Sequence, residues 1–88
     1  MPEKYVCTVV MIVNDPMPEG SQARRKVFLN SDEMDSADAA KAFGEAMLRN
    51  DAVAYRVRYR SKPTETWVLH PYVVYEPAEV SALKVLRY

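Results

Sequence analysis

Three arginines alternate with apolar residues along one short segment of the chain. They are Arg56, Arg58 and Arg60, and Lys62 continues the same two-residue spacing. Because successive side chains of a β-strand point to opposite faces, this spacing aligns the positive charges on one face. One guanidinium group can form two parallel hydrogen bonds with a phosphate or a carboxylate. The row of arginines therefore indicates a surface that binds an anionic partner. A second basic run joins this patch if the two segments lie in one sheet: Arg24, Arg25 and Lys26.

The basic patch has three interpretations. Its arginines contact phosphates while His70 and Tyr72 on an adjoining strand stack on bases, as in sheet-faced single-strand binders. Alternatively, it docks onto an acidic or mixed protein surface, and the acidic start of the helix, with Asp32 and Glu33, adds contacts. In the third interpretation it is a solvated strand face whose arginines pair with neighbouring acids. Zero net charge, from 12 basic and 12 acidic residues, counts against nucleic acid, because that affinity comes largely from excess positive charge.

Groups that carry catalysis are sparse in this sequence. Cys7 lies in a β-type run without a neighbouring positive charge, so we expect a small buried hydrophobe rather than a nucleophile. His70 is the only histidine, and no oriented carboxylate and nucleophile accompany it in sequence. We therefore expect no enzymatic activity. A small-ligand-binding or enzymatic dimer, with an interface cleft near Cys7 and His70, stays open as an alternative.

The sequence also lacks the usual patterns for a metal or a nucleotide cofactor. One histidine and one cysteine cannot supply the four N or S ligands of a structural zinc site. The two glycines, Gly20 and Gly44, stand alone and form no phosphate-binding loop. The acids within residues 32–38 lack the order of a calcium-binding EF-hand loop, and helix capping accounts for them. We expect neither a metal nor a cofactor.

Length and composition indicate one small intracellular domain. The 88 residues, 49% hydrophobic and 27% charged, suit a single folded domain over residues 1–88. The longest apolar run, residues 5–13, is about half the length of a membrane-spanning helix, and no secretory cleavage site follows it. A small secreted domain usually carries several cysteines, so the single one here favours the cytoplasm.

The pattern of apolar residues predicts four strands and one main helix. Runs of β-branched and aromatic residues indicate strands, and apolar residues at helical spacing indicate the helix. The expected order is strand 4–13, loop 14–23, strand 24–30, helix 31–51, strand 53–60, strand 66–76, and a short C-terminal helix or fifth strand. This order predicts an α+β fold, a four-stranded antiparallel sheet with one main helix packed on one face.

Two of these elements carry more specific expectations. Asp35 or Ser36 is expected to cap the main helix. A stripe of mostly small side chains then packs on the sheet: Ala37, Ala40, Phe43, Gly44 and Met47. In strand 53–60, the expected buried face is formed by Val53, Tyr55, Val57 and Tyr59.

Two further features concern the sheet as a whole. Pro71 cannot donate a ladder hydrogen bond, so it requires a bulge or an edge strand. One helix and a short tail leave much of an apolar sheet uncovered. This favours a homodimer formed through a sheet edge or through the uncovered face.

The segment over residues 31–47, SDEMDSADAAKAFGEAM, follows a strand hairpin and precedes further strands. This succession resembles small proteins encoded by phages and mobile elements, including some anti-CRISPR inhibitors. The resemblance covers roughly residues 25–60. It implies a non-enzymatic protein that covers a nucleic-acid-binding or partner-binding surface of a host complex, and it carries over no functional residue.

We therefore expect a cytoplasmic, homodimeric binding protein without catalytic activity that inhibits a host nucleic-acid-processing complex. Its partner is a protein or nucleoprotein surface, and a sheet-faced nucleic-acid-binding module is the nearest alternative. The expected contact residues are Arg56, Arg58, Arg60, Lys62, Arg24, Arg25, Lys26, Asp32, Glu33 and Tyr72.

Overall fold

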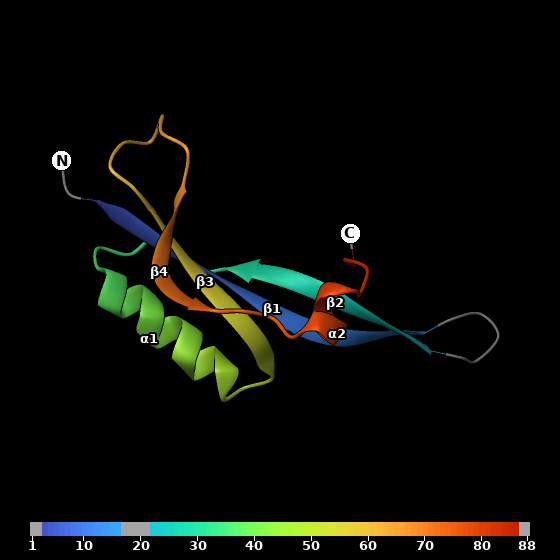
Figure 1. Ribbon diagram of the computed structural model, residues 1–88. Helices are drawn as coiled ribbons and strands as arrows, with labels where there is room; N and C mark the ends of the chain where they lie inside the picture. Colours follow the sequence, from blue (N-terminus) through green and yellow to red (C-terminus); the bar gives the residue numbers. More distant parts are fainter. Residues whose placement is uncertain (1–2, 17–21, 87–88) are drawn as a thin grey trace.

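The computed structural model of the chain describes residues 3–16 and 22–86. In that part of the chain, four antiparallel strands form one sheet in the order β2-β1-β3-β4. Figure 1 shows the main helix α1 against one side of this sheet. The elements are β1 (Lys4–Pro16), β2 (Gln22–Asn30), α1 (Ala37–Leu48), β3 (Ala52–Arg60), β4 (Val68–Val74) and α2 (Ala78–Ser81). The predicted α+β fold is confirmed.

The central strand β1 is covered on both faces, as its apolar sequence predicts. It pairs with β2 along one edge and with β3 along the other. Cys7 and Val9 are fully buried beneath α1. Val10, on the opposite face, packs with Val80 of α2. Burial of an aliphatic side chain stabilises the fold by about 1.5–3 kcal/mol, so β1 supplies much of the core.

The first hairpin is longer than the sequence predicts. Residues 14–23 were expected to form a loop, but both strands extend into it, since Asn14 pairs with Arg24 and Pro16 with Gln22. Backbone pairing across the hairpin overrides the turn preference of Asn14, Asp15 and Pro16. The rest of that expected loop, residues 17–21, lies outside the described residues.

The main helix is shorter at its start than the predicted span of residues 31–51. Ser36 caps it, because its side-chain oxygen accepts a hydrogen bond from the Ala39 amide at 3.0 Å. The preceding residues pair with β1 instead: the Ser31 amide donates to the Cys7 carbonyl at 2.8 Å, and Met34 bridges to Tyr5. Backbone groups already bonded to a strand cannot join a helix, which explains the difference.

Small residues let α1 lie directly on β3, as expected. Ala40 and Gly44 are buried on the inner side of the helix, and Phe43 and Met47 pack beside them. A Cβ atom placed on Gly44 would lie 2.5 Å from Cγ of Tyr55. Tyr55 is itself buried, and its hydroxyl donates to Glu45 at 3.1 Å. The Gly44–Tyr55 contact therefore sets the distance between helix and sheet.

A bulge in the pairing of β1 with β3 changes one expected side-chain direction. The register shifts between Val10 and Met11. As a result Val53, which strict alternation places with Tyr55 and Val57, instead packs with the Val10 cluster on the other face. This expectation was wrong because alternation assumes an unbroken ladder.

Pro71 lies in the edge strand β4, at an irregularity in its pairing with β3, as expected. The register shifts opposite the segment between Arg56 and Arg58. His70 and Tyr72, two residues apart, both contact side chains on the helix side of the sheet.

The C-terminal element is a helix, α2, and not a fifth strand. After it, the chain makes one parallel bridge to the outer edge of β2, where the Lys26 amide donates to the Lys84 carbonyl and the Leu86 amide donates to the Lys26 carbonyl. These bonds tie the C-terminal segment to the sheet. No helix in the described ranges is long and apolar enough to cross a membrane.

The close contact predicts that Gly44→Ala destabilises the protein by about 1–3 kcal/mol, the usual cost of overpacking. Alanine favours helices, so without the contact the same change would stabilise α1. Urea unfolding followed by circular dichroism measures the difference. The matched control is Ala42→Gly at an exposed position of α1, which should cost only about 0.5–1 kcal/mol. A Gly44→Ala variant as stable as the native chain would contradict the proposed packing.

Candidate functional site

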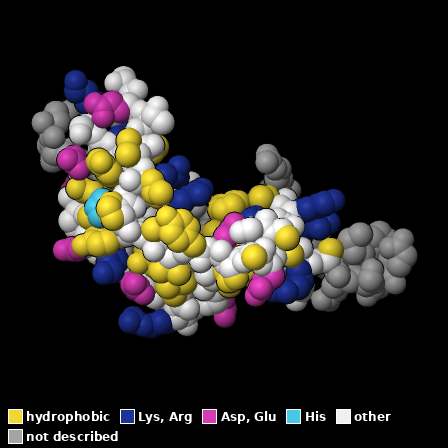
Figure 2. Space-filling view, viewed as in Figure 1, with side chains coloured by type: hydrophobic (Ala, Val, Ile, Leu, Met, Phe, Trp, Pro, Cys, Tyr) yellow, Lys and Arg dark blue, Asp and Glu magenta, His cyan; other side chains and the backbone are white. Residues whose placement is uncertain are grey.

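The sheet face opposite α1 is covered only in part. At one end α2 covers it, with Val80 packed against Val10 and Ala54. Beside this contact a cavity of about 490 Å³ opens to solvent, and we call it the open-face groove. In Figure 2 apolar side chains gather across the middle of the molecule, with Lys or Arg side chains beside them. The groove is lined by Thr8, Val10, Phe28, Ala54, Tyr55, Arg56, Arg58, Trp67, Leu69, Val73, Val74, Tyr75 and Glu76.

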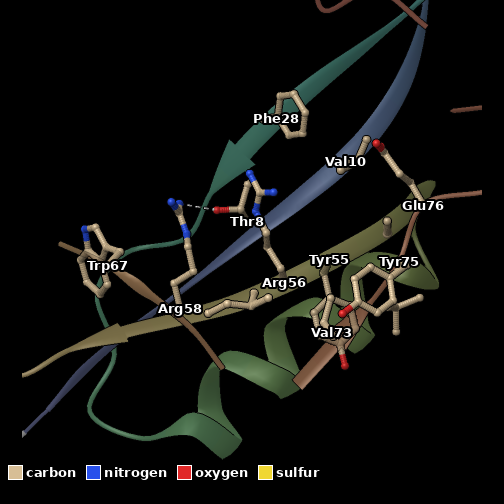
Figure 3. A pocket seen from close by; sticks show the side chains of 13 residues that line it. Thr8, Val10, Phe28, Tyr55, Arg56, Arg58, Trp67, Val73, Tyr75 and Glu76 are labelled. Carbon is tan, nitrogen blue, oxygen red and sulfur yellow. Dashed lines mark hydrogen bonds between the residues drawn. The ribbon is translucent and has the colours of Figure 1, made fainter. Parts of the chain in front are cut away.

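The walls and floor of the groove come from different strands (Figure 3). Phe28 of β2 stands on one side, while Trp67 and Tyr75 flank the two ends of β4. Phe28 is 40% exposed and Tyr75 is 76% exposed. Large aromatic side chains exposed around a cavity are typical of binding sites.

The floor carries two guanidinium groups side by side, both reaching from β3 towards Thr8 of β1 (Figure 3). Arg58 Nη2 donates to Thr8 Oγ1 at 3.0 Å, and this oxygen donates in turn to Asn30 Oδ1 at 2.6 Å. The guanidinium carbon of Arg56 lies 5.8 Å from the centre of the Phe28 ring. The chain of hydrogen bonds fixes the Arg58 side chain in the groove.

The positive charges of Arg56 and Arg58 are not neutralised by nearby acidic side chains of the described residues. Neither makes an ion pair with a carboxylate that the structure describes. Arg58 Nε is buried and has no hydrogen-bond partner among the described atoms. Burial, and secondarily the neighbouring charge of Arg56, lowers the pKa of Arg58 from its usual value. Burial and the neighbouring charge thus disfavour the positive charge of Arg58, and a bound anion would relieve that cost.

The groove also contains a carboxylate near α2. Glu76 Oε1 accepts hydrogen bonds from Lys26 Nζ at 3.0 Å and from the Ser81 hydroxyl at 3.2 Å. Its other oxygen, Oε2, is buried and accepts no hydrogen bond from the described residues. The Lys26 side chain is only 8% exposed. The ion pair neutralises the charge of Lys26, so Lys26 is not a free cation of the groove.

Only some of the predicted contact residues lie together at the open-face groove. Arg56 and Arg58 lie together, while Lys26 shares their face but is paired with Glu76. Arg60 pairs with Glu33 at 3.3 Å, and its guanidinium lies over the Trp67 ring at 4.2 Å. The others do not line the groove: Arg24, Arg25, Lys62, Asp32 and Tyr72.

Tyr72 and His70 do not interleave with the arginines, because they contact the helix side of the sheet. The Tyr72 hydroxyl donates to Asp38 of α1 at 3.2 Å, and Lys41 lies over its ring at 4.7 Å. The His70 ring packs against Tyr72 with their centres 4.6 Å apart, and also against Tyr5 and Tyr59. Alternation along β4 puts His70 and Tyr72 on one face and Leu69 and Val73 on the other, and the pairing with β3 places Leu69 and Val73 on the side of the arginines.

Cys7 is fully buried, as expected, and burial raises the pKa of its thiol to about 11. A neutral, inaccessible thiol is neither a nucleophile nor a metal ligand. Nδ1 of His70 accepts a hydrogen bond from the Tyr72 amide at 3.1 Å, which orients the ring. Within the described ranges, no three His, Cys, Asp or Glu side chains are placed to hold a metal ion.

The aromatic side chains of the groove and Glu76 were not among the predicted contact residues. Phe28 lies two residues from Lys26, and Trp67 lies two residues from Leu69, so alternation places each pair on one face. The pairing of β2 with β1, and of β4 with β3, was the missing information, because it decides which of these pairs meet across the sheet.

No protein family, curated protein sequence or solved structure matches this chain.

The buried thiol predicts that the protein loses stability as the pH rises from about 9 towards 11. In this range the unfolded state releases the Cys7 proton at its ordinary pKa of 9.0, while the folded state keeps it until about 11. The unfolded state then binds fewer protons, so the free energy of unfolding falls with pH. Denaturant unfolding across this range measures the slope.

Cys7→Ala should flatten this slope although it lowers stability overall by leaving a small cavity. Part of the slope should remain at the highest pH, because burial also raises the pKa of Tyr55 from 10.0 to about 12. An unchanged slope between pH 9 and 10 in the variant would show that Cys7 is not the group responsible.

Proposed function

We propose that this chain is a non-enzymatic binding protein whose open-face groove contacts an anionic macromolecular surface. The observation that carries this proposal is the pair Arg56 and Arg58, two guanidinium groups side by side without a described carboxylate partner. Exposed aromatic side chains around them add apolar contact area. Arginine and aromatic residues dominate the binding energy of macromolecular interfaces.

The state of the potential catalytic groups supports binding rather than catalysis. Cys7 is buried with a raised pKa, and the Nδ1 atom of His70 is engaged by the backbone. Neither residue lines the open-face groove. A cleft that joins the two at a subunit interface would require Cys7 to leave the core beneath α1, which disfavours the enzymatic alternative.

The specific form that we propose is an inhibitor of a host nucleic-acid-processing complex, acting in the cytoplasm. The resemblance of residues 25–60 to anti-CRISPR proteins supports this form. The charge of the groove adds a physical reason, since such complexes carry phosphate-rich nucleic acid and acidic protein surfaces. Two neighbouring positive charges, one of them held by hydrogen bonds, attract such surfaces from a distance and orient them on contact.

We propose that the expected homodimer, if it forms, uses another surface. A twofold dimer buries the same patch of both copies against itself. Pairing two open faces would bring the Arg56 and Arg58 charges of one copy against those of the other. The edge of β4, where Val68 is exposed and does not line the groove, is the better candidate for self-association.

The test is a double charge reversal, Arg56→Glu with Arg58→Glu, in a plasmid-interference assay. The native chain, expressed in cells with an active CRISPR system, should restore transformation by a targeted plasmid. With the variant, the number of transformants should be at least about tenfold lower than with the native chain, because every 1.4 kcal/mol of lost binding free energy is a factor of ten in affinity. Circular dichroism checks that the variant is folded.

The matched control reverses two charges on the opposite side of the sheet, Lys41→Glu with Arg49→Glu on α1. Both side chains are exposed, and neither lines the groove. We expect this control to inhibit interference as the native chain does. Equal loss in both variants would mean that net charge acts rather than the groove, and a native chain without any effect would reject the inhibitor function.

A further inference from the structure

We infer that the anionic partner of the open-face groove is single-stranded nucleic acid, with phosphates on Arg56 and Arg58 and bases stacked on the surrounding aromatic rings. This inference rests on the proposed function, because it takes the same groove as the contact surface. It adds the chemical class of the partner, which the charge of the groove alone does not decide.

The shape of the groove favours a single strand over a duplex. Its volume of about 490 Å³ is that of a small-ligand pocket, and it is bounded by aromatic walls from β2 and from both ends of β4. A duplex presents phosphates on a wide convex surface and keeps its base faces stacked inside. A single strand can place a phosphate on the floor and turn its unstacked bases onto the walls.

The aromatic walls are suited to stacking. Phe28, Trp67 and Tyr75 come from three places in the sequence and meet around the same cavity. Arg60 lies over the Trp67 ring at 4.2 Å, which holds the indole in place before a ligand arrives. A stacking surface that is already ordered costs less entropy on binding.

The Glu76 carboxylate distinguishes a nucleotide from an acidic peptide. Glu76 lines the groove, and its carboxylate carries a negative charge there beside the positive charge of Lys26. A peptide rich in Asp and Glu would bring further negative charge to this carboxylate. A nucleotide carries its negative charge on the phosphate. Its base has N–H groups that can donate hydrogen bonds to a carboxylate such as that of Glu76. The combination of two arginines, aromatic rings and one carboxylate therefore fits a nucleotide better.

The test is a fluorescence titration of the purified chain with single-stranded DNA of about ten nucleotides, a typical length for such sites. Trp67 is the only tryptophan, so its quenching reports binding in the groove itself. Two phosphate contacts on a single strand predict a slope of about −1.4 in log affinity against log salt concentration, or about sevenfold weaker binding at 200 than at 50 mM salt.

Variants then assign the contacts, with anisotropy of a labelled strand as the readout. Arg56→Gln and Arg58→Gln should each remove about half of the salt dependence, leaving about a threefold change. Trp67→Leu and Phe28→Leu should each weaken binding about tenfold while leaving the salt dependence unchanged. The control Arg49→Gln, on α1, should bind as the native chain does.

Three competing ligands decide between nucleic acid and simple charge attraction. An abasic strand of the same length has the phosphates without the bases, and it should bind much more weakly. A duplex of the same sequence and a polyglutamate peptide of equal charge should also be weaker. Equal binding of the peptide or the abasic strand, or no quenching at 50 mM salt, would overturn this inference.

The outcomes also separate this inference from the proposed function. If Arg56→Glu with Arg58→Glu abolishes inhibition but single strands do not bind, the groove acts on a protein surface, so the inference fails and the function stands. If single strands bind in the groove but the charge reversal leaves inhibition intact, the inference stands and the proposed function fails.

Discussion

The structure depends on how one 12-residue helix covers one face of the sheet. Gly44 brings α1 onto the ring of Tyr55, so that the apolar side chains of β1 and β3 on that side are enclosed. The opposite face has only the short helix α2, which covers the end near Val10. The middle of that face is left to side chains that tolerate water, and there β3 presents Arg56 and Arg58. The open-face groove follows from this unequal coverage of the two faces.

The pairing of the strands decides which side chains share the groove. The bulge in β3 moves Val53 to the open face, where it helps α2 to pack. The register of β4 against β3 places His70 and Tyr72 on the helix side and Leu69 and Val73 with the arginines. The protein therefore has two separate aromatic groups. One is a cluster around His70 that packs beside the core, and the other surrounds two positive charges and is open to solvent.

The sequence predicts the elements and the sheet well, but it predicts the groove only in part. Alternation in residues 53–60 correctly groups Arg56 with Arg58, and the small residues of α1 correctly predict its buried side. Tyr72 was grouped with the arginines because alternation alone does not show which face of β4 lies on their side, and only the register with β3 decides it. Phe28 and Glu76 were missed because their positions depend on strand register and on contacts distant in sequence, such as the one between Lys26 and Glu76. Such contacts are set by the assembled sheet, not by local residue patterns.

Binding on the open face can be tested by amide chemical-shift mapping by NMR, with a single-stranded oligonucleotide as the ligand. We expect shifts concentrated at Thr8, Phe28, Arg56, Arg58 and Trp67, with little change along α1. Shifts centred on the cluster of Tyr5, Tyr59 and His70 would contradict it, because those side chains lie on the other side of the sheet.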